Sequence, residues 1–471
     1  MKRMLEVACL LVVGLLSSAR GEGREAPAED VVTAAHALES DEVLAWLLSM
    51  PDVYVVGEVP SGIPDTRFFR LYFAQPMDHA DPDSDWFWLR ATLLHRSLEA
   101  PTVLYSTGYA SRTAPSRAEP TELLDANQLS LEHRFYGVSR PAPLDWRRLD
   151  IAQAANDYHR VIQAFKPMYP GRWLTTGESK GGMAAVYHRY FFPDDVDATV
   201  AYATPSLQGA VDDGIARFLE QVGTHACRER LRAFQREALL RREELVTLLA
   251  RTGMTFHRLG ADRALEFAIV ETPFYFFQYE DLSRCERIPG REASSQELLD
   301  FVDEVTAMET SFADLGVSYY APFYYQSATQ LGYPSFPTRH LRGLLRYPGE
   351  DVPATYLSFP VEAPFSQDVL RHVERWARDE GERLLFIHGE NDPWSTRPYE
   401  VRESNDSHLY VVPGGHLGNT LLRSLAEPER TRAMTRLFQW MDVKLPAQSE
   451  GELTGPRWMG GEVRSERSSR R

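Results

Sequence analysis

The strongest constraint on the fold is an alternation of strands and helices in the middle of the chain. Apolar residues have helical spacing over residues 150–165, and a short strand-like run follows over 172–176. Helical spacing returns over 180–190, and another strand-like run covers 198–203. Parallel strands of one sheet are joined by helical crossovers. The pattern therefore predicts an α/β fold with a parallel sheet covered by helices on both faces.

The same pattern extends to both sides of this region. A helix is expected over residues 31–50, followed by strands rich in aromatic and β-branched residues over 52–56, 67–73, 86–95 and 102–106, and by an apolar run over 128–132. Further along the chain we expect a helix over 367–378, strands over 383–388 and 408–412, and a final helix from about 419 to 443. We assign 31–205 and 351–445 to one catalytic domain.

Residues 206–350 interrupt this pattern and are mainly helical in character. One apolar stripe at helical spacing contains Leu231, Phe234, Ala238, Leu245, Leu248 and Leu249. Aromatic residues gather at 274–277, 319–320 and 323–325. Insertions into α/β scaffolds commonly cover the active site. We therefore predict that 206–350 forms a helical lid.

The two ends of the chain carry different signals. Lys2 and Arg3 precede an apolar run and then small residues, which predicts a signal peptide over 1–19 and a secreted or periplasmic protein. Glu6 interrupts the run, so a buried first helix is the alternative. Residues 446–471 lack an apolar period and are predicted to be a disordered tail. Elsewhere no stretch approaches the roughly 18 apolar residues of a membrane span, so stable membrane association is not expected.

Composition narrows the class of partner. The chain has 471 residues, of which 43% are hydrophobic, and its formal net charge is -16. Nucleic acid is excluded as a partner, because a phosphate backbone selects a basic face and the body of the chain has no basic block. Once a signal peptide is removed, Cys227 and Cys285 are the remaining cysteines. They form either one disulfide or two separate buried thiols.

The segment Gly177-Glu178-Ser179-Lys180-Gly181 carries the chemistry. It lies between a predicted strand and a predicted helix, which is the setting of a nucleophile elbow. Ser179 would stand on a tight turn at a helix N-terminus, where the helix dipole favours developing negative charge. The backbone N–H of Lys180 would supply half of an oxyanion hole. This motif predicts an α/β-hydrolase fold with Ser179 as the nucleophile.

A nucleophilic serine needs a base and an acid, and in this fold they follow it in the order acid, histidine. Asp392 lies in a turn after the strand over 383–388, and His416 follows the strand over 408–412. We therefore assign Asp392 as the orienting acid and His416 as the base. Glu390 is the competing acid, and His388 lies within its strand and is interpreted as structural. No metal-ligand, P-loop or dinucleotide motif is found, so no cofactor is expected.

Longer motifs in the chain resemble those of a known family. They are Phe73-Ala74-Gln75-Pro76-Met77-Asp78-His79, Val103-Leu104-Tyr105-Ser106-Thr107-Gly108-Tyr109-Ala110, Leu131-Glu132-His133-Arg134-Phe135-Tyr136-Gly137, Gly177 to Met183, Tyr187-His188-Arg189, Phe191 to Asp197 and Gly389 to Trp394. Over about residues 50 to 445 the chain resembles the secreted bacterial tripeptidyl aminopeptidases, serine peptidases related to the prolyl carboxypeptidase and dipeptidyl peptidase group.

The resemblance implies an exopeptidase that removes short peptides from a free N-terminus, often with proline before the cut. It places nucleophile, acid and histidine on Ser179, Asp392 and His416, as the motifs do. The resemblance implies that the loop 107–109 gives the second oxyanion donor, which we assign to the Tyr109 N–H.

A free N-terminus also requires an acid in the lid, because a buried ammonium needs a paired carboxylate. Glu271, Glu280 and Asp281 are candidates, and we place Glu271 and Trp394 among the residues that bind the peptide substrate. The aromatic clusters offer a flat apolar pocket for proline or, alternatively, belong to the core of the lid.

Two other functions remain open at this stage. An esterase or lipase would use the same sheet and the same three catalytic residues, so the motifs around the nucleophile do not separate it from a peptidase. A catalytically silent binding protein with a hydrolase fold is the other alternative. The intact and correctly ordered serine, aspartate and histidine argue against it.

Overall fold

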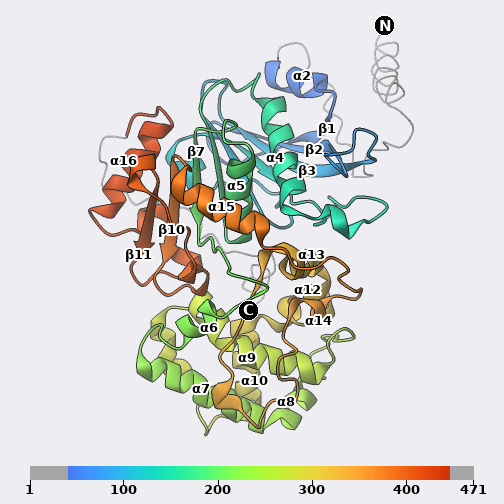
Figure 1. Ribbon diagram of the computed structural model, residues 1–471, viewed down its shortest axis with the longest axis vertical. Helices are drawn as coiled ribbons and strands as arrows, with labels where there is room; N and C mark the ends of the chain where they lie inside the picture. Colours follow the sequence, from blue (N-terminus) through green and yellow to red (C-terminus); the bar gives the residue numbers. More distant parts are fainter. Residues whose placement is uncertain (1–40, 446–471) are drawn as a thin grey trace.

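The computed structural model describes residues 41–445, which fold around one large mixed sheet (Figure 1). Its nine strands have the order β1-β2-β3-β5-β4-β6-β7-β10-β11. Their bounds are β1 Val53–Val59, β2 Arg67–Pro76, β3 Trp86–His95, β4 Thr102–Ser106, β5 Asn127–Leu131, β6 Trp173–Glu178, β7 Ala198–Tyr202, β10 Leu384–Gly389 and β11 His408–Val412. The strands from β5 to β11 in this order are parallel, whereas β1, β2 and β3 pair antiparallel. The predicted parallel sheet is present.

Helices cover both faces of the sheet, as the alternation predicted. They are α2 Glu42–Ser49, α3 Glu119–Leu123, α4 Ile151–Phe165, α5 Lys180–Phe191, α15 Asp368–Asp379 and α16 Glu429–Trp440. Tyr158, Val161 and Ile162 of α4 pack on one side, and Leu437 and Phe438 of α16 pack on the other. Every residue of β7 and β10 is buried, whereas the edge strand β11 alternates buried and exposed positions. Burial on both faces is typical of parallel strands.

A second body of helices lies together beside the sheet, in the lower half of Figure 1. We call residues 214–356 the helical segment. Its helices are α6 Gly214–Leu219, α7 His225–Leu240, α8 Arg242–Leu249, α9 Ala261–Tyr279, α10 Ser295–Thr306, α11 Met308–Ser311, α12 Asp314–Tyr319, α13 Ala321–Gln326 and α14 Pro353–Tyr356. A parallel pair of short strands, β8 Val211–Asp212 and β9 Tyr333–Pro334, lies at its base. The helical character expected from the sequence is observed.

Short turns of helix connect these elements. They are η1 Trp146–Arg148, η2 Leu282–Arg287, η3 Ser327–Leu331, η4 Arg339–Leu341, η5 Pro393–Thr396, η6 Glu403–Asn405, η7 Leu417–Asn419 and η8 Leu422–Ser424. Helix α9 contacts η5 and η7, which follow β10 and β11. The helical segment therefore meets the sheet at the carboxyl ends of its strands. No helix between residues 41 and 445 is long and apolar enough to cross a bilayer.

The sequence left open whether the two cysteines form a disulfide. Cys227 of α7 and Cys285 of η2 form a disulfide.

The single helix expected over about 419–443 is wrong: two short turns come first, and α16 begins only at Glu429. The backbone N–H groups of Leu422 and Arg423 donate to Glu119 at 2.8 and 3.0 Å, which takes them out of any helix ladder. Pro428 has no N–H and immediately precedes α16.

Some predictions concern residues outside the described range. The signal peptide over 1–19, the tail over 446–471 and the first ten residues of the helix expected over 31–50 lie there. Nothing in the structure bears on them.

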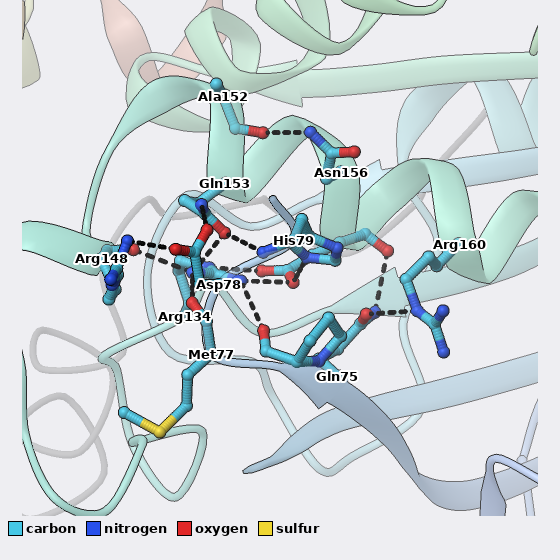
Figure 2. A network of polar contacts seen from close by, with 12 residues as sticks. Gln75, Met77, Asp78, His79, Arg134, Arg148, Ala152, Gln153, Asn156 and Arg160 are labelled. Carbon is cyan, nitrogen blue, oxygen red and sulfur yellow. Dashed lines mark hydrogen bonds and ion pairs between the residues drawn. The ribbon is translucent and has the colours of Figure 1, made fainter. Parts of the chain in front are cut away.

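A buried polar network joins the end of β2, the loop after β5 and the start of α4 (Figure 2). The Arg134 guanidinium, 1% exposed, donates to both carboxylate oxygens of Asp157 at 2.7 Å and to the carbonyl of Met77. His79 Nε2 lies 2.8 Å from Asp157 Oδ1. A bidentate pair of this kind fixes geometry as well as charge. It holds Arg134 in place, and the preceding residue, His133, donates its N–H to the carbonyl oxygen of Tyr109.

Candidate active site

Ser179 stands on a strained turn between β6 and α5. Its backbone angles, φ 50° and ψ -120°, lie in a region that side-chain-bearing residues rarely occupy. A Cβ on Gly177 would lie 2.3 Å from the carbonyl carbon of Gly181, and one on Gly181 would lie 2.3 Å from the carbonyl oxygen of Ser106. Only glycine fits at both positions. The structure therefore has the sharp turn that the motif predicted.

Lys180 ties the neighbouring loop to this turn. Its side chain is 4% exposed, and its Nζ donates to the carbonyl oxygen of Gly108 at 2.7 Å. The ammonium also lies 5.4 Å from the ring centre of Tyr109 and 5.2 Å from that of Tyr136. Burial lowers the pKa of Lys180 well below its ordinary value. In a trans peptide the C=O and N–H point in opposite directions, so this bond fixes the direction of the Tyr109 N–H.

Tyr109 presents two donors, of which the sequence indicated one. Its backbone N–H donates to Thr107 Oγ1 at 3.3 Å. Its phenol faces the nucleophile: burial raises the pKa of Tyr109 well above its ordinary value, and a side-chain hydrogen bond with Ser179 acts in the opposite direction. The phenol is a hydrogen-bonding group near Ser179 that the motif did not reveal, because a motif fixes the backbone and leaves the rotamer open.

Asp392 and His416 reach the same edge of the sheet as Ser179. They follow β10 and β11, whose last residues, Gly389 and Val412, pair in register. Asp392 is fully buried, and its Oδ1 accepts the Trp394 N–H at 3.1 Å. Its Oδ2 is buried and has no hydrogen-bond partner among residues 41–445. Burial raises the pKa of Asp392 to about 8.

The ring of His416 points toward the helical segment. Its Nδ1 accepts the Gly418 N–H at 3.1 Å, and its Nε2 lies 3.5 Å from Asp281 Oδ1. Burial lowers the pKa of His416, whereas Asp281 and Glu280 act to raise it. The structure thus brings Ser179, Asp392 and His416 to one edge but does not join them by hydrogen bonds.

The two competing side chains have other surroundings. Glu390 is exposed and accepts the Gly414 N–H at 2.7 Å. His388 is 1% exposed within β10, and burial lowers its pKa to about 4. Its position inside the sheet matches the structural role expected from the sequence.

A cavity of about 210 Å³ contains Ser179 and extends into the helical segment. Glu271 and Trp394, both expected to bind substrate, line its wall together with Ser179. Aromatic residues of the helical segment complete it, among them Tyr275, Tyr279, Tyr319, Tyr320, Phe323 and Phe336. The aromatic clusters therefore serve as cavity wall as well as core.

Glu271 is a buried acid in the lining of this cavity. It is 4% exposed, and its Oε1 accepts a hydrogen bond from the Tyr356 hydroxyl at 3.2 Å. Tyr356 also donates to Asp351 Oδ1 at 2.8 Å. Burial and the neighbouring Asp351 raise the pKa of Glu271 well above its ordinary value. Of the other candidate acids, Glu280 pairs with Arg284 and Asp281 faces His416.

The sheet order and the elbow define the chain as an α/β-hydrolase. The family model of PS-10 peptidase S37 matches residues 38–458. A protein of Streptomyces mobaraensis named prolyl tri/tetrapeptidyl aminopeptidase is 38% identical over 452 residues, which are 94% of this chain and 93% of that protein. The chain belongs to the PS-10 peptidase S37 family, the tripeptidyl aminopeptidases, and is a serine-type aminopeptidase.

Solved structures are more distant. A proline iminopeptidase of Mycobacterium smegmatis shares 16% identity, covers 82% of this chain and 99% of its own, and superposes with a TM-score of 0.34. A homoserine O-acetyltransferase of Staphylococcus aureus shares 14% identity, covers 81% of this chain and 98% of its own, and gives 0.38. Neither value carries weight in the fold assignment, which rests on the sheet and the elbow.

Proposed function

We propose that this aminopeptidase is exported and releases short peptides, chiefly tripeptides with proline before the cut, from free N-termini through an acyl-enzyme. The observation that carries the proposal is that Ser179 and the buried acid Glu271 line one cavity. The name of the Streptomyces mobaraensis relative supports the proline preference and the product length. Export rests on residues 1–19 of the sequence alone.

In the proposed reaction, Ser179 Oγ attacks the carbonyl carbon of the scissile bond while His416 takes its proton. The carbonyl oxygen becomes an oxyanion, stabilised by the Lys180 N–H and by Tyr109. His416 then gives the proton to the leaving amine, the C–N bond breaks, and an ester on Ser179 remains. Water, activated by His416, hydrolyses that ester and releases the short peptide.

Asp392 would orient His416 in this sequence. The unpartnered Oδ2 of Asp392 is a buried acceptor that the His416 ring can satisfy by turning away from Asp281. The positive charge that forms on His416 would then favour the ionised form of Asp392, against the effect of burial, which raises its pKa to about 8. The turn of the ring is part of the proposed mechanism.

The helical segment would act as the lid that selects the substrate. A peptide with a free N-terminus places an ammonium against Glu271, whereas a blocked peptide leaves that carboxyl without a cation. Trp394 and Phe274 pack at 5.3 Å between ring centres at the cavity wall, and such flat apolar surfaces suit a proline ring. The boundary of this lid, at 206–350 with a catalytic domain over 31–205 and 351–445, remains part of the proposal.

The test uses the mature protein and its Ser179→Ala variant on a chromogenic Ala-Ala-Pro amide. The peptide is supplied with a free and with an acetylated N-terminus, beside a short-chain ester. We expect cleavage of the free-amine peptide only, lost in the variant. Ester turnover without peptide cleavage would identify an esterase, and no Ser179-dependent activity on any substrate would identify a silent binding protein.

A further inference from the structure

Glu271, which lines the cavity, and Asp351 meet across one tyrosine hydroxyl. Glu271 lies in the middle of α9, and Asp351 lies just before α14. The hydroxyl of Tyr356 lies 3.2 Å from Glu271 Oε1 and 2.8 Å from Asp351 Oδ1. A phenol carries a single proton, so it donates fully to one carboxyl at a time. Asp351 Oδ2 is buried and finds no hydrogen-bond partner within the described part of the chain.

The groups that face these two carboxyls are acids and phenols. Asp351 and Tyr356 act on the pKa of Glu271, and Glu271 and Tyr356 act on that of Asp351. The phenols of Tyr275, Tyr324 and Tyr333 lie close enough to feel the charge of Glu271. Among residues 41–445 no lysine or arginine contributes to the pKa of either acid.

Such a pair cannot hold two negative charges at low cost. Two adjacent carboxylates in a buried site repel each other, and one of them keeps a proton. Burial raises the pKa of Asp351 to about 7, and burial together with Asp351 raises that of Glu271 well above its ordinary value. The missing positive charge must therefore come from a proton or from a ligand.

A ligand bound in the cavity can contact Glu271. Glu271 is 4% exposed and lines the same cavity as Ser179. The cavity lining is rich in aromatic side chains, Tyr275, Tyr324 and Tyr333 among them, and these carry no charge that would repel a cation. A cationic group in this cavity can therefore reach Glu271, which the Tyr356 hydroxyl links to Asp351.

We propose that Glu271 and Asp351 together form the receptor for the substrate's α-ammonium, and that the empty receptor holds a proton which ammonium binding releases. On binding, the O–H bond of the protonated carboxyl breaks and its proton passes to solvent. The ammonium replaces that proton between two carboxylates, and no covalent bond forms. This inference rests on the proposed function and adds to it Asp351 and a coupling between substrate binding and protonation.

The coupling gives the KM a defined pH dependence. Below the pKa of the pair, substrate must displace a proton, so KM for a free-amine peptide falls as the pH rises. The fall ends where the substrate's own α-amino group loses its proton, near its ordinary pKa of about 8. The kcat would not follow this dependence, because the bound ammonium has already displaced the proton.

Proton release is measured directly with a protein that cannot cleave. The Ser179→Ala variant is titrated with the tripeptide Ala-Ala-Pro in two buffers of different ionisation enthalpy, at about pH 6.5, between the pKa of an ordinary carboxyl and that of an α-amine. We expect the calorimetric enthalpies to differ by the amount that corresponds to release of a proton. The difference should shrink when Asp351→Asn is added, because burial alone then favours the protonated form of Glu271. Peptide binding with equal enthalpies in both buffers would overturn the shared proton.

Kinetics in the otherwise intact enzyme test the receptor itself. Asp351→Asn should raise KM for the free-amine peptide at least about tenfold, with a smaller change in kcat, since it removes one partner of a buried charge contact. The matched control is Glu350→Gln, an exposed neighbour outside the cavity, which should change neither. Thermal unfolding of each variant shows whether it is folded.

The experiments distinguish a failure of the proposed peptidase function from a failure of the Glu271–Asp351 receptor. Wild-type enzyme that does not cleave the free-amine peptide would refute the proposed function and the receptor with it. Wild-type enzyme that cleaves it, beside a folded Asp351→Asn variant with unchanged KM, would refute the receptor and leave the proposed function standing.

Discussion

His416 Nε2 lies 3.5 Å from Asp281 Oδ1, a carboxylate contributed by the helical segment. Because the Nδ1 atom of His416 accepts the Gly418 N–H, a neutral ring carries its proton on Nε2. The proposed mechanism needs the opposite arrangement, with Nδ1–H directed at Asp392 and Nε2 free to accept from Ser179. In the proposed mechanism the observed contact therefore belongs to a resting arrangement, in which the helical segment contacts the proposed base directly through Asp281.

The first prediction concerns the acidic limb of the pH–rate profile. Asp281 acts to raise the pKa of His416 against the lowering effect of burial. Asp281→Asn removes that support, so the pKa of His416 falls further. The base must be neutral to accept a proton, so the acidic limb of kcat/KM should move to lower pH. Glu286→Gln, an exposed neighbour on η2, is the control. An unchanged limb would show that the contact does not govern the base.

The second prediction separates stability from activity at Asp392. Burial raises its pKa in the folded protein to about 8, against about 3.9 in an unfolded chain. The folded state thus binds more protons between these values, and this group makes stability fall as the pH rises from about 4 to about 8.

Asp392→Asn removes that penalty, so the variant should melt at a higher temperature than the wild type at about pH 9 and at a similar one at about pH 4. Its kcat should fall by about 10⁴-fold, because His416 loses its orienting group. Calorimetric scans at both pH values test this, with the exposed Asp368→Asn as the control. A lower melting temperature at the higher pH would contradict the argument.

The third prediction concerns the clamp between Lys180 and the Gly108 carbonyl. Lys180→Met removes the hydrogen bond of 2.7 Å that fixes the direction of the following peptide. The oxyanion donors would lose alignment, which costs transition-state stabilisation more than ground-state binding. We expect kcat to fall by roughly 10- to 100-fold with little change in KM. The exposed Lys444→Met is the control. A change confined to KM would place Lys180 in substrate binding instead.

Patterns of neighbouring residues in the sequence predicted the strands of the sheet and the turn at Ser179. The features that the sequence did not predict depend on contacts between residues that are distant in the chain. The bounds of β3, β4 and β11 coincide with the strands predicted from the sequence, because the residue pattern that predicts a strand lies within the strand itself. The elbow at Ser179 was equally local. By contrast, Asp351 meets Glu271 only through the folding of α9 against α14, and no motif surrounds it. The late start of α16 has the same kind of cause. Glu119, which is distant in the sequence, accepts the backbone N–H of Leu422 and keeps that residue out of the helix.

The fourth prediction concerns the buried pair of Arg134 and Asp157. Burial raises the pKa of Asp157, but Arg134 and His79 outweigh it and hold that pKa below its ordinary value. Its contribution to stability is therefore present above about pH 4 and lost as the pH falls through the folded-state pKa. Asp157→Asn leaves a buried guanidinium unpaired and should cost about 3–5 kcal/mol in the free energy of unfolding at neutral pH. The difference from wild type in denaturant titrations should shrink in acid. A constant difference would point to packing rather than charge.

The last prediction concerns the disulfide beside the Asp281 contact. Cys227 and Cys285 are 58 residues apart, and their bond fastens η2, which follows Asp281, to α7. Closing a loop of that length in the unfolded chain corresponds to about 4 kcal/mol in the chain-entropy model. The Cys227→Ser, Cys285→Ser double variant should therefore unfold at a lower temperature than the oxidised wild type. A reductant should lower the melting temperature of the wild type toward that of the variant and leave the variant unchanged. Equal melting temperatures of oxidised and reduced wild type would show that packing of α7, α9 and α10 alone holds the helical segment together.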